Sequence, residues 1–248
     1  MQLKDATVLI VDDEPVLCEI KSAWLTRLVG RVLVASNGVE ALEILSVNHV
    51  DLVITDIRMP VMDGVTLLKT IKASGKPQPK VIFITGFSDF DPRDAYDLGA
   101  DAILEKPMDR DDLLHMVKRS LTTRHELWRT PADSIPAAVL RSSFASLATA
   151  LHEQKIAFGR GGFCIAMSQD MQEGPLGILL EFHDDRSVLQ GQGIVRWISP
   201  VEGLAGIELL YVAPTSSEWV AELAQHNEIV AYIPRSPSAQ RTLSAKTA

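Results

Sequence analysis

Polar residues suited to phosphoryl chemistry follow four strand-like runs in the first half of the chain. They are Asp12 and Asp13, Asp56, Thr85 and Lys106. Three carboxylates packed together repel one another, which favours a divalent cation between them. Mg²⁺ suits such a cluster because it prefers oxygen ligands and keeps waters that an incoming phosphate can displace. One carboxylate could then act as nucleophile and form an aspartyl phosphate, while the lysine ammonium and the threonine hydroxyl contact the phosphoryl oxygens.

The elements that must position these residues are five short apolar runs separated by stretches with helical spacing. The runs are Thr7–Val11, Val32–Ala35, Leu52–Thr55, Val81–Ile84 and Ala102–Leu104. Such alternation predicts an α/β doubly wound fold with five parallel strands covered by helices on both faces. The carboxyl ends of parallel strands share one edge of the sheet, where ligands bind at the topological switch point. We therefore expect the polar residues to converge there.

Each of these residues also has a purely structural interpretation when taken alone. Asp12 or Asp13 could cap the helix that begins near Pro15. Thr85 is an ordinary β-branched strand residue, and a lysine before a proline is often a solvated loop charge. Asp56 could be a turn residue. Their joint occurrence at strand ends favours the phosphoryl-transfer interpretation.

The motifs around these residues resemble the receiver domain of two-component response regulators, over about residues 5–125. They are Val11–Glu14, Asp56–Pro60 with Asp63-Gly64, Thr85-Gly86 and Lys106-Pro107. The resemblance implies a flavodoxin-like fold in which Asp56 accepts a phosphoryl group from a histidine kinase or a phosphotransfer protein. It makes the chain a signalling switch and not an enzyme with turnover.

The resemblance also implies roles for the individual residues. Asp13, Asp56 and the backbone carbonyl of Arg58 would bind Mg²⁺ directly, and Asp12 would contribute through water. Thr85 would sense the phosphate, and the lysine would form an ion pair with it. In this family the Lys106–Pro107 bond is commonly cis.

One position departs from the family pattern. Ile103 lies three residues before the lysine, where the family often has an aromatic switch residue. We therefore expect activation through repacking of an aliphatic side chain, or through dimerisation on the face of the fourth and fifth helices. A long last helix, from about Asp109 to Trp128, would support a phosphorylation-linked homodimer.

The second half of the chain has a different pattern of apolar and turn residues. Two prolines and small polar residues at 130–136 predict a linker between a receiver domain of residues 1–129 and a second domain of residues 137–233. After a helix over Ala137–Glu153 and before a closing helix over Ser217–His226, short strands divided by turn residues predict a small antiparallel β-barrel. The runs are Phe163–Met167, Gly177–Phe182, Gly193–Ile198 and Leu204–Val212. The Ser- and Pro-rich tail, 234–248, is expected to be disordered.

Glycine-led strands such as Gly161–Ile165 and Gly191–Trp197 give this second domain a resemblance to PilZ domains. PilZ domains that bind cyclic di-GMP use two arginines and a short polar motif. Here that motif has lost its polar residues, so Gly162 and a single possible contact, Arg160, are what remain. We expect an atypical PilZ-like domain that binds a protein partner and not cyclic di-GMP. The alternative is an adaptor in which the nucleotide still binds.

Composition and motifs exclude other classes of function. The formal net charge of −8 argues against nucleic acid as a partner, and the second half has no helix-turn-helix with a basic recognition helix. It also has no catalytic set. An apolar run of membrane-spanning length and a signal-peptide pattern are both lacking, so we expect a cytoplasmic protein without a membrane partner. Cys18 and Cys164 are expected to be buried thiols.

Overall fold

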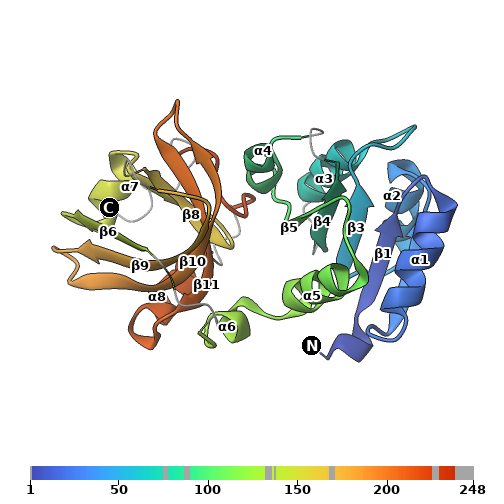
Figure 1. Ribbon diagram of the computed structural model, residues 1–248, viewed down its shortest axis with the longest axis horizontal. Helices are drawn as coiled ribbons and strands as arrows, with labels where there is room; N and C mark the ends of the chain where they lie inside the picture. Colours follow the sequence, from blue (N-terminus) through green and yellow to red (C-terminus); the bar gives the residue numbers. More distant parts are fainter. Residues whose placement is uncertain are drawn as a thin grey trace. The chain divides into compact units, whose positions relative to one another are not determined.

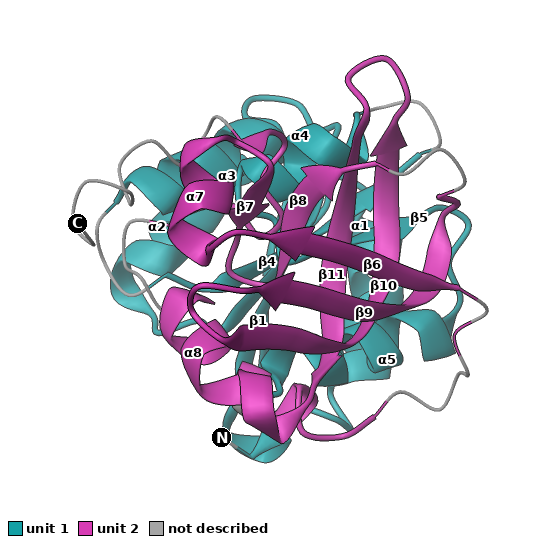
Figure 2. Cartoon of the chain, turned by 90° about the vertical axis from the view of Figure 1, so that its left-hand side faces the viewer, with its two compact units in different colours: residues 1–123 teal, residues 124–248 magenta. Residues whose placement is uncertain are grey.

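The chain forms two compact units, residues 1–123 and 124–248 (Figure 2). The structure is a computed structural model that describes residues 2–74, 78–86, 90–131, 136, 138–167, 171–224 and 229–237. Most of the expected linker at 130–136 and of the expected tail at 234–248 lies outside the described residues. His226, where the closing helix was expected to end, also lies outside them.

The first unit contains a five-stranded parallel sheet in the order β2-β1-β3-β4-β5 (Figure 1). Its strands are β1 (Thr7–Val11), β2 (Arg31–Ala35), β3 (Leu52–Asp56), β4 (Lys80–Thr85) and β5 (Ala102–Glu105). Each pairing in this sheet is parallel. The doubly wound prediction is confirmed, and each observed strand agrees with the predicted run to within one residue at either end.

Helices cover both faces of this sheet, which explains why its central strands are continuous apolar runs. They are α1 (Pro15–Leu25), α2 (Gly38–Val47), α3 (Gly64–Ala73), α4 (Pro92–Asp97) and α5 (Arg110–Leu121), preceded by a short 3-10 helix, η1 (Leu3–Asp5). Alternate residues of β1 belong to separate hydrophobic clusters. Val8 and Ile10 pack with residues of α1 and α5, whereas Leu9 and Val11 pack with residues of α2, α3 and α4.

The prediction of one helix over 109–128 is wrong. Helix α5 ends at Leu121, and a separate short helix, α6, spans Arg124–Leu127. Thr122 has an extended backbone, with φ −69° and ψ 141°, so the helical hydrogen-bond ladder ends there. The Lys80 ammonium donates to the carbonyls of Ser120 and Thr122 and satisfies groups that the helix end leaves open.

The second unit is a curled half-barrel of six strands in the order β6-β9-β10-β11-β8-β7 (Figure 2). The strands are β6 (Val139–Phe144), β7 (Ile156–Phe158), β8 (Gly162–Ala166), β9 (Gly174–Phe182), β10 (Ser187–Ser199) and β11 (Leu204–Val212). Two helices, α7 (Leu147–His152) and α8 (Pro214–Ala224), complete it. The sheet is mixed and not purely antiparallel, because β6 pairs with β9 in parallel.

The prediction of one helix over Ala137–Glu153 is also wrong. Among the described residues of that range, the segment before Ala145 is strand β6, and only 147–152 are helical. Leu140 is buried between exposed Val139 and Arg141, as in a strand with side chains on alternate faces. Short apolar runs of this kind fit helix and strand equally well by spacing. Ser146 then starts α7, because its side chain accepts a hydrogen bond from the Thr149 N–H.

Trp128 packs in the core of the second unit, although it precedes the expected linker. Its indole Nε1 donates to the carbonyl of Leu209 at 3.1 Å, and its own carbonyl accepts from the Val212 N–H at 3.0 Å. Both cysteines are buried free thiols, as expected. Within the described part of the chain, no helix is long and apolar enough to cross a membrane.

Candidate functional site

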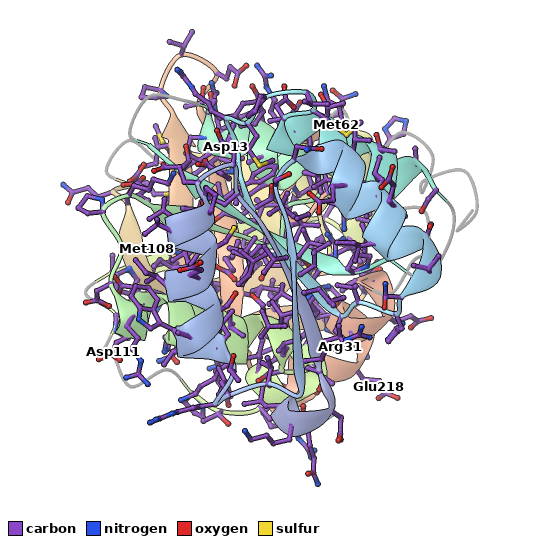
Figure 3. All side chains as sticks on the ribbon, turned by 90° about the vertical axis from the view of Figure 1, so that its right-hand side faces the viewer. Asp13, Arg31, Met62, Met108, Asp111 and Glu218 are labelled. Carbon is purple, nitrogen blue, oxygen red and sulfur yellow. The ribbon has the colours of Figure 1, made fainter. Side chains whose placement is uncertain are left out.

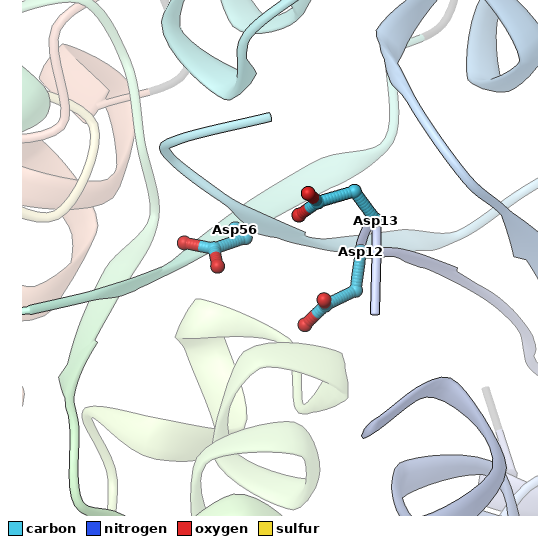
Figure 4. A group of neighbouring side chains, drawn as sticks. All are labelled: Asp12, Asp13 and Asp56. Atoms are coloured by element: carbon cyan, nitrogen blue, oxygen red, sulfur yellow. The ribbon is translucent and has the colours of Figure 1, made fainter. Parts of the chain in front are cut away.

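Three carboxylates meet at one edge of the parallel sheet, as their positions at strand ends predict. Oxygens of Asp12, Asp13 and Asp56 lie within 4.8 Å of one another (Figure 4). Figure 3 shows Asp13, which follows β1, at the end of the first unit opposite to Arg31, with which β2 begins. Asp12 and Asp56 are buried, with exposed fractions of 1% and 6%, whereas Asp13 is exposed. The cluster therefore opens to solvent on the Asp13 side.

Both carboxylate oxygens of Asp56 accept hydrogen bonds. Oδ1 accepts from the Ile57 N–H at 2.7 Å, and Oδ2 accepts from Lys106 Nζ at 2.5 Å. Lys106 follows β5, and β4 separates that strand from β3, so the topology brings together residues 50 positions apart. The Lys106–Pro107 bond is cis, which confirms the expectation.

The charges around Lys106 favour its protonated form. Burial lowers the pKa of Lys106, but the hydrogen bond and the negative charge of Asp56 outweigh this effect. Asp12 and Glu14 add smaller attractions, so the pKa lies above its usual value. The lysine is thus a permanent counter-charge at neutral pH. Its side chain is 34% exposed, which leaves it room to move with a ligand.

Thr85 is the last residue of β4 and lies buried at the same edge of the sheet. Its hydroxyl donates to the carbonyl of the next residue, Gly86, at 2.9 Å. This hydroxyl must therefore rotate away from the Gly86 carbonyl before it can donate to another oxygen.

Asp12 has a partner that the sequence did not suggest. Its Oδ2 forms a buried ion pair with the ammonium of Lys21 in α1, and its Oδ1 accepts from the Glu14 N–H at 3.0 Å. A signal for this contact was available. Lys21 lies on the face of α1 that also presents buried Cys18 and Leu25, at spacings of three and four residues, and a lysine in such a position needs a buried partner.

A hollow of about 640 Å³ adjoins the exposed side of the cluster. It is lined by Asp13, Ile57, Arg58, Met59, Pro60, Asp63, Val65 and Phe90. Asp63 caps α3 by accepting a hydrogen bond from the Thr66 N–H, and its neighbour Gly64 lies against the Asp56 carbonyl. The Asp63-Gly64 pair thus fixes the start of α3 beside the carboxylates. Ligation by the carbonyl of Arg58, whose side chain is exposed, stays a prediction.

The other predicted residues lie apart from this cluster. Ile103 is a half-buried residue of β5 that packs in the hydrophobic cluster shared with α2, α3 and α4. In the second unit, the Arg160 backbone N–H donates to the Ala231 carbonyl, and its Nε donates to the Val230 carbonyl, each at 2.9 Å. Gly162 begins β8, where a Cβ would come within 2.0 Å of the Ile207 carbonyl oxygen.

Comparison with known proteins assigns the first unit to a family. Residues 8–118 match the model of the response regulator receiver domain. The first unit is a receiver domain. Its cluster of three aspartates is the acidic triad typical of receiver Mg²⁺ sites.

Curated relatives are similar to about half of the chain. The chain is 32% identical over 130 residues to the sensor histidine kinase RcsC of Escherichia coli (strain K12), covering 52% of this chain and 13% of that protein. It is 37% identical to the transcriptional regulatory protein ZraR of Klebsiella oxytoca, covering 56% and 31%. With the transcriptional regulatory protein CrdR of Helicobacter pylori (strain ATCC 700392 / 26695), identity is 36% and coverage is 45% and 53%. The chain thus spans about half or less of the length of these three relatives.

Two solved structures each match about half of the chain. A receiver domain protein from Clostridium thermocellum is 33% identical and matches 47% of this chain and 94% of its own, with a TM-score of 0.42. The chemotaxis response regulator CheY4 of Vibrio cholerae is 28% identical and matches 47% and 99%, with a TM-score of 0.43. The family match ends at residue 118, so it assigns the half-barrel of the second unit to no family.

Proposed function

We propose that this chain is a cytoplasmic response regulator whose receiver domain takes a phosphoryl group onto Asp56 from a sensor histidine kinase or a phosphotransfer protein. The observation that supports this most is the position of the Asp56 carboxylate. It lies within 4.8 Å of two further carboxylates and accepts a hydrogen bond from Lys106. The nucleophile, the metal ligands and the counter-charge for a phosphoryl group are therefore in one place.

The oxygen atoms of the cluster fit Mg²⁺, which prefers carboxylate and carbonyl ligands. Asp13, Asp56 and the Arg58 carbonyl would hold the ion, with Asp12 contributing through water. When bound, the metal supplies positive charge that stabilises the transferring phosphoryl group. Exposed Asp13 lets the ion enter from solvent, and the hollow beside it provides room for the donor.

Asp56, Lys106 and Thr85 have separate roles in the phosphoryl transfer. An oxygen of Asp56 attacks the phosphorus of a phosphohistidine, and the phosphorus–nitrogen bond breaks as the new oxygen–phosphorus bond forms. Oδ2 is the oxygen that faces Lys106, so the ammonium can pass from Asp56 to the phosphoryl oxygens. The Thr85 hydroxyl leaves the Gly86 carbonyl and donates to the new phosphoryl group. The movement of Thr85 would begin the conformational response.

Intact-mass spectrometry with acetyl phosphate and Mg²⁺ tests this assignment. The wild-type chain should gain one phosphoryl group, and Asp56→Asn should gain none. Asp63→Asn is the matched control, because Asp63 lines the same hollow and asparagine also caps helices well. Phosphorylation of Asp56→Asn to the wild-type level would refute the proposal.

The second unit is proposed as the output domain, PilZ-like and acting through a protein partner. One hydrogen bond argues against nucleotide binding, since the Arg160 guanidinium already donates from Nε to the Val230 carbonyl of the same chain. Full-length chain, with and without beryllofluoride, should capture different partners from a lysate, and Asp56→Asn should capture the same partners in both conditions.

Calorimetry with cyclic di-GMP tests nucleotide binding and should give no binding heat. Tight binding that Arg160→Ala abolishes would overturn this reading.

A phosphorylation-linked homodimer through α4 and α5 is proposed from the family resemblance. Static light scattering should show a rise in mean mass when beryllofluoride and Mg²⁺ are added. The Asp56→Asn chain is the control and should scatter equally with and without the reagent. An unchanged mass in the wild-type chain would contradict dimerisation.

A further inference from the structure

A second lysine, besides Lys106, lies in the acidic cluster and belongs to a different element. Lys21 is 3% exposed, and its ammonium forms an ion pair with Oδ2 of buried Asp12. A buried ammonium is stable only when it is paired, so this contact is fixed by the position of Lys21 on the inner face of α1. Two ammonium groups of the protein itself therefore offset part of the negative charge of the three carboxylates.

The pair places a positive charge directly on one oxygen of Asp12, inside the cluster. Oδ1 accepts from the Glu14 N–H at 3.0 Å, and Oδ2 accepts from Lys21, so both oxygens already have a donor. Asp13 differs, because it is exposed. Asp56 also differs, because its partner Lys106 is partly exposed and can move. The Lys21 ammonium is therefore the fixed positive charge of the cluster, whereas the Lys106 ammonium can move.

We propose that Lys21 is a built-in counterion that lowers the metal affinity of the phosphoryl site. This inference rests on the proposed function, since it concerns the same metal site. The charge on Lys21 offsets one of the three carboxylates, so the cluster attracts a divalent ion less strongly than the carboxylates alone would. The receiver therefore needs a higher metal concentration for binding than it would without the charge on Lys21.

The test replaces Lys21 with methionine, which keeps the length of the side chain and removes its charge. Mn²⁺ is the probe because it takes the same oxygen ligands as Mg²⁺ and its free concentration can be followed by electron paramagnetic resonance. We expect Lys21→Met to bind Mn²⁺ roughly tenfold more tightly than the wild-type chain. The Mg²⁺ concentration needed for half-maximal phosphorylation by acetyl phosphate should fall in the same proportion.

Lys72→Met is the matched control. Lys72 is a half-buried lysine of the first unit, and its ammonium is paired with a buried aspartate, Asp101, at 3.9 Å. Asp101 accepts from the N–H of Val81 near the start of β4, at the opposite edge of the sheet from the cluster. Lys72→Met should lower the free energy of unfolding without changing the affinity for Mn²⁺. If Lys21→Met fails to fold, Lys21→Gln provides the same loss of charge with a hydrogen-bond donor to Asp12.

The outcomes separate this inference from the function on which it rests. Tighter Mn²⁺ binding in Lys21→Met, with Lys72→Met unchanged, supports the counterion role. Equal affinity in Lys21→Met and the wild-type chain overturns it while leaving the phosphoryl site intact. Mn²⁺ binding that Asp56→Asn does not weaken would overturn both, because the metal would then lie elsewhere.

Discussion

Gly64, the first residue of α3, allows the helix to approach the backbone of Asp56. A Cβ placed on Gly64 would lie 2.2 Å from the Asp56 carbonyl oxygen and 3.2 Å from its carbonyl carbon. The Gly64 N–H also donates to the Ile57 carbonyl at 3.0 Å, so the start of the helix cannot simply tilt away. We therefore expect Gly64→Ala to displace the backbone that carries the phosphoryl acceptor.

The size of the effect follows from this geometry. Real Cβ atoms almost never lie closer than 3.0 Å to another heavy atom, so the 2.2 Å contact must lengthen by about 0.8 Å. Overpacking that forces such a backbone movement costs about 1–3 kcal/mol. Misplacement of a reacting group by about 1 Å slows a reaction on the order of a hundredfold. Gly64→Ala should therefore lose about 1–3 kcal/mol of unfolding free energy and slow phosphorylation by a factor of roughly ten to one hundred.

Gly38→Ala is a close control, because Gly38 is the first residue of α2 as Gly64 is of α3. Its added Cβ would meet the side chain of Met62, at 2.6 Å from Cγ and 2.8 Å from Sδ. A flexible thioether can move where a backbone carbonyl cannot, so we expect a loss of about 1 kcal/mol or less. Figure 3 marks Met62.

Two assays measure the two quantities. Urea unfolding gives the free energy, and the initial rate of phosphorylation by acetyl phosphate at saturating Mg²⁺ gives the effect on the acceptor. If Gly64→Ala reacts at the wild-type rate with unchanged stability, or if both alanine variants behave alike, the close approach of α3 to Asp56 does not position the acceptor.

Further predictions concern both units. Tyr232→Phe removes a 2.6 Å hydrogen bond to buried Glu208, so urea unfolding should show a loss of about 1.5–3 kcal/mol, and an unchanged midpoint would refute the contact. Trp128→Phe loses an indole hydrogen bond in the core of the second unit, so hydrogen exchange should speed up in residues 124–248 and not in 1–123. Hydrogen bonds from the hydroxyl and the N–H of Ser36 lower the pKa of Glu40, so their stabilisation is present above the unfolded pKa and is lost as pH falls through the folded pKa. An NMR titration should therefore find a higher Glu40 pKa in Ser36→Ala, and an identical pKa would contradict this cause.

The sequence was sufficient for the first unit because its signals are local and its topology has few solutions. Five β-branched runs define the parallel strands, and parallel topology alone brings their carboxyl ends together. Asp56 and Lys106 could therefore be placed side by side from the sequence, although 50 residues separate them. Topology does not predict the contact between Lys21 and Asp12, whose signal is a lysine among the buried positions of α1.

The second unit was harder to predict because its pairings are not local. The parallel pairing of β6 with β9 joins residues almost forty positions apart, and nothing in the spacing of Val139 and Leu140 distinguishes a strand from a helix. The end of α5 depended on Lys80, which contacts carbonyls at the end of that helix from a distant strand. Tertiary contacts, and not local propensity, determine that β6 is a strand and where α5 ends.

Chemical trapping identifies the phosphoryl acceptor. The full chain is phosphorylated with acetyl phosphate and Mg²⁺, the acyl phosphate is reduced with borohydride, and the product is mapped by peptide mass spectrometry. Reduction converts a phosphorylated aspartate into homoserine, which marks the modified position permanently. We predict homoserine at position 56 in the wild-type chain and in Asp63→Asn, and its absence when Mg²⁺ is removed. Homoserine at position 12 or 13, with none at position 56, would show that Asp56 is not the acceptor.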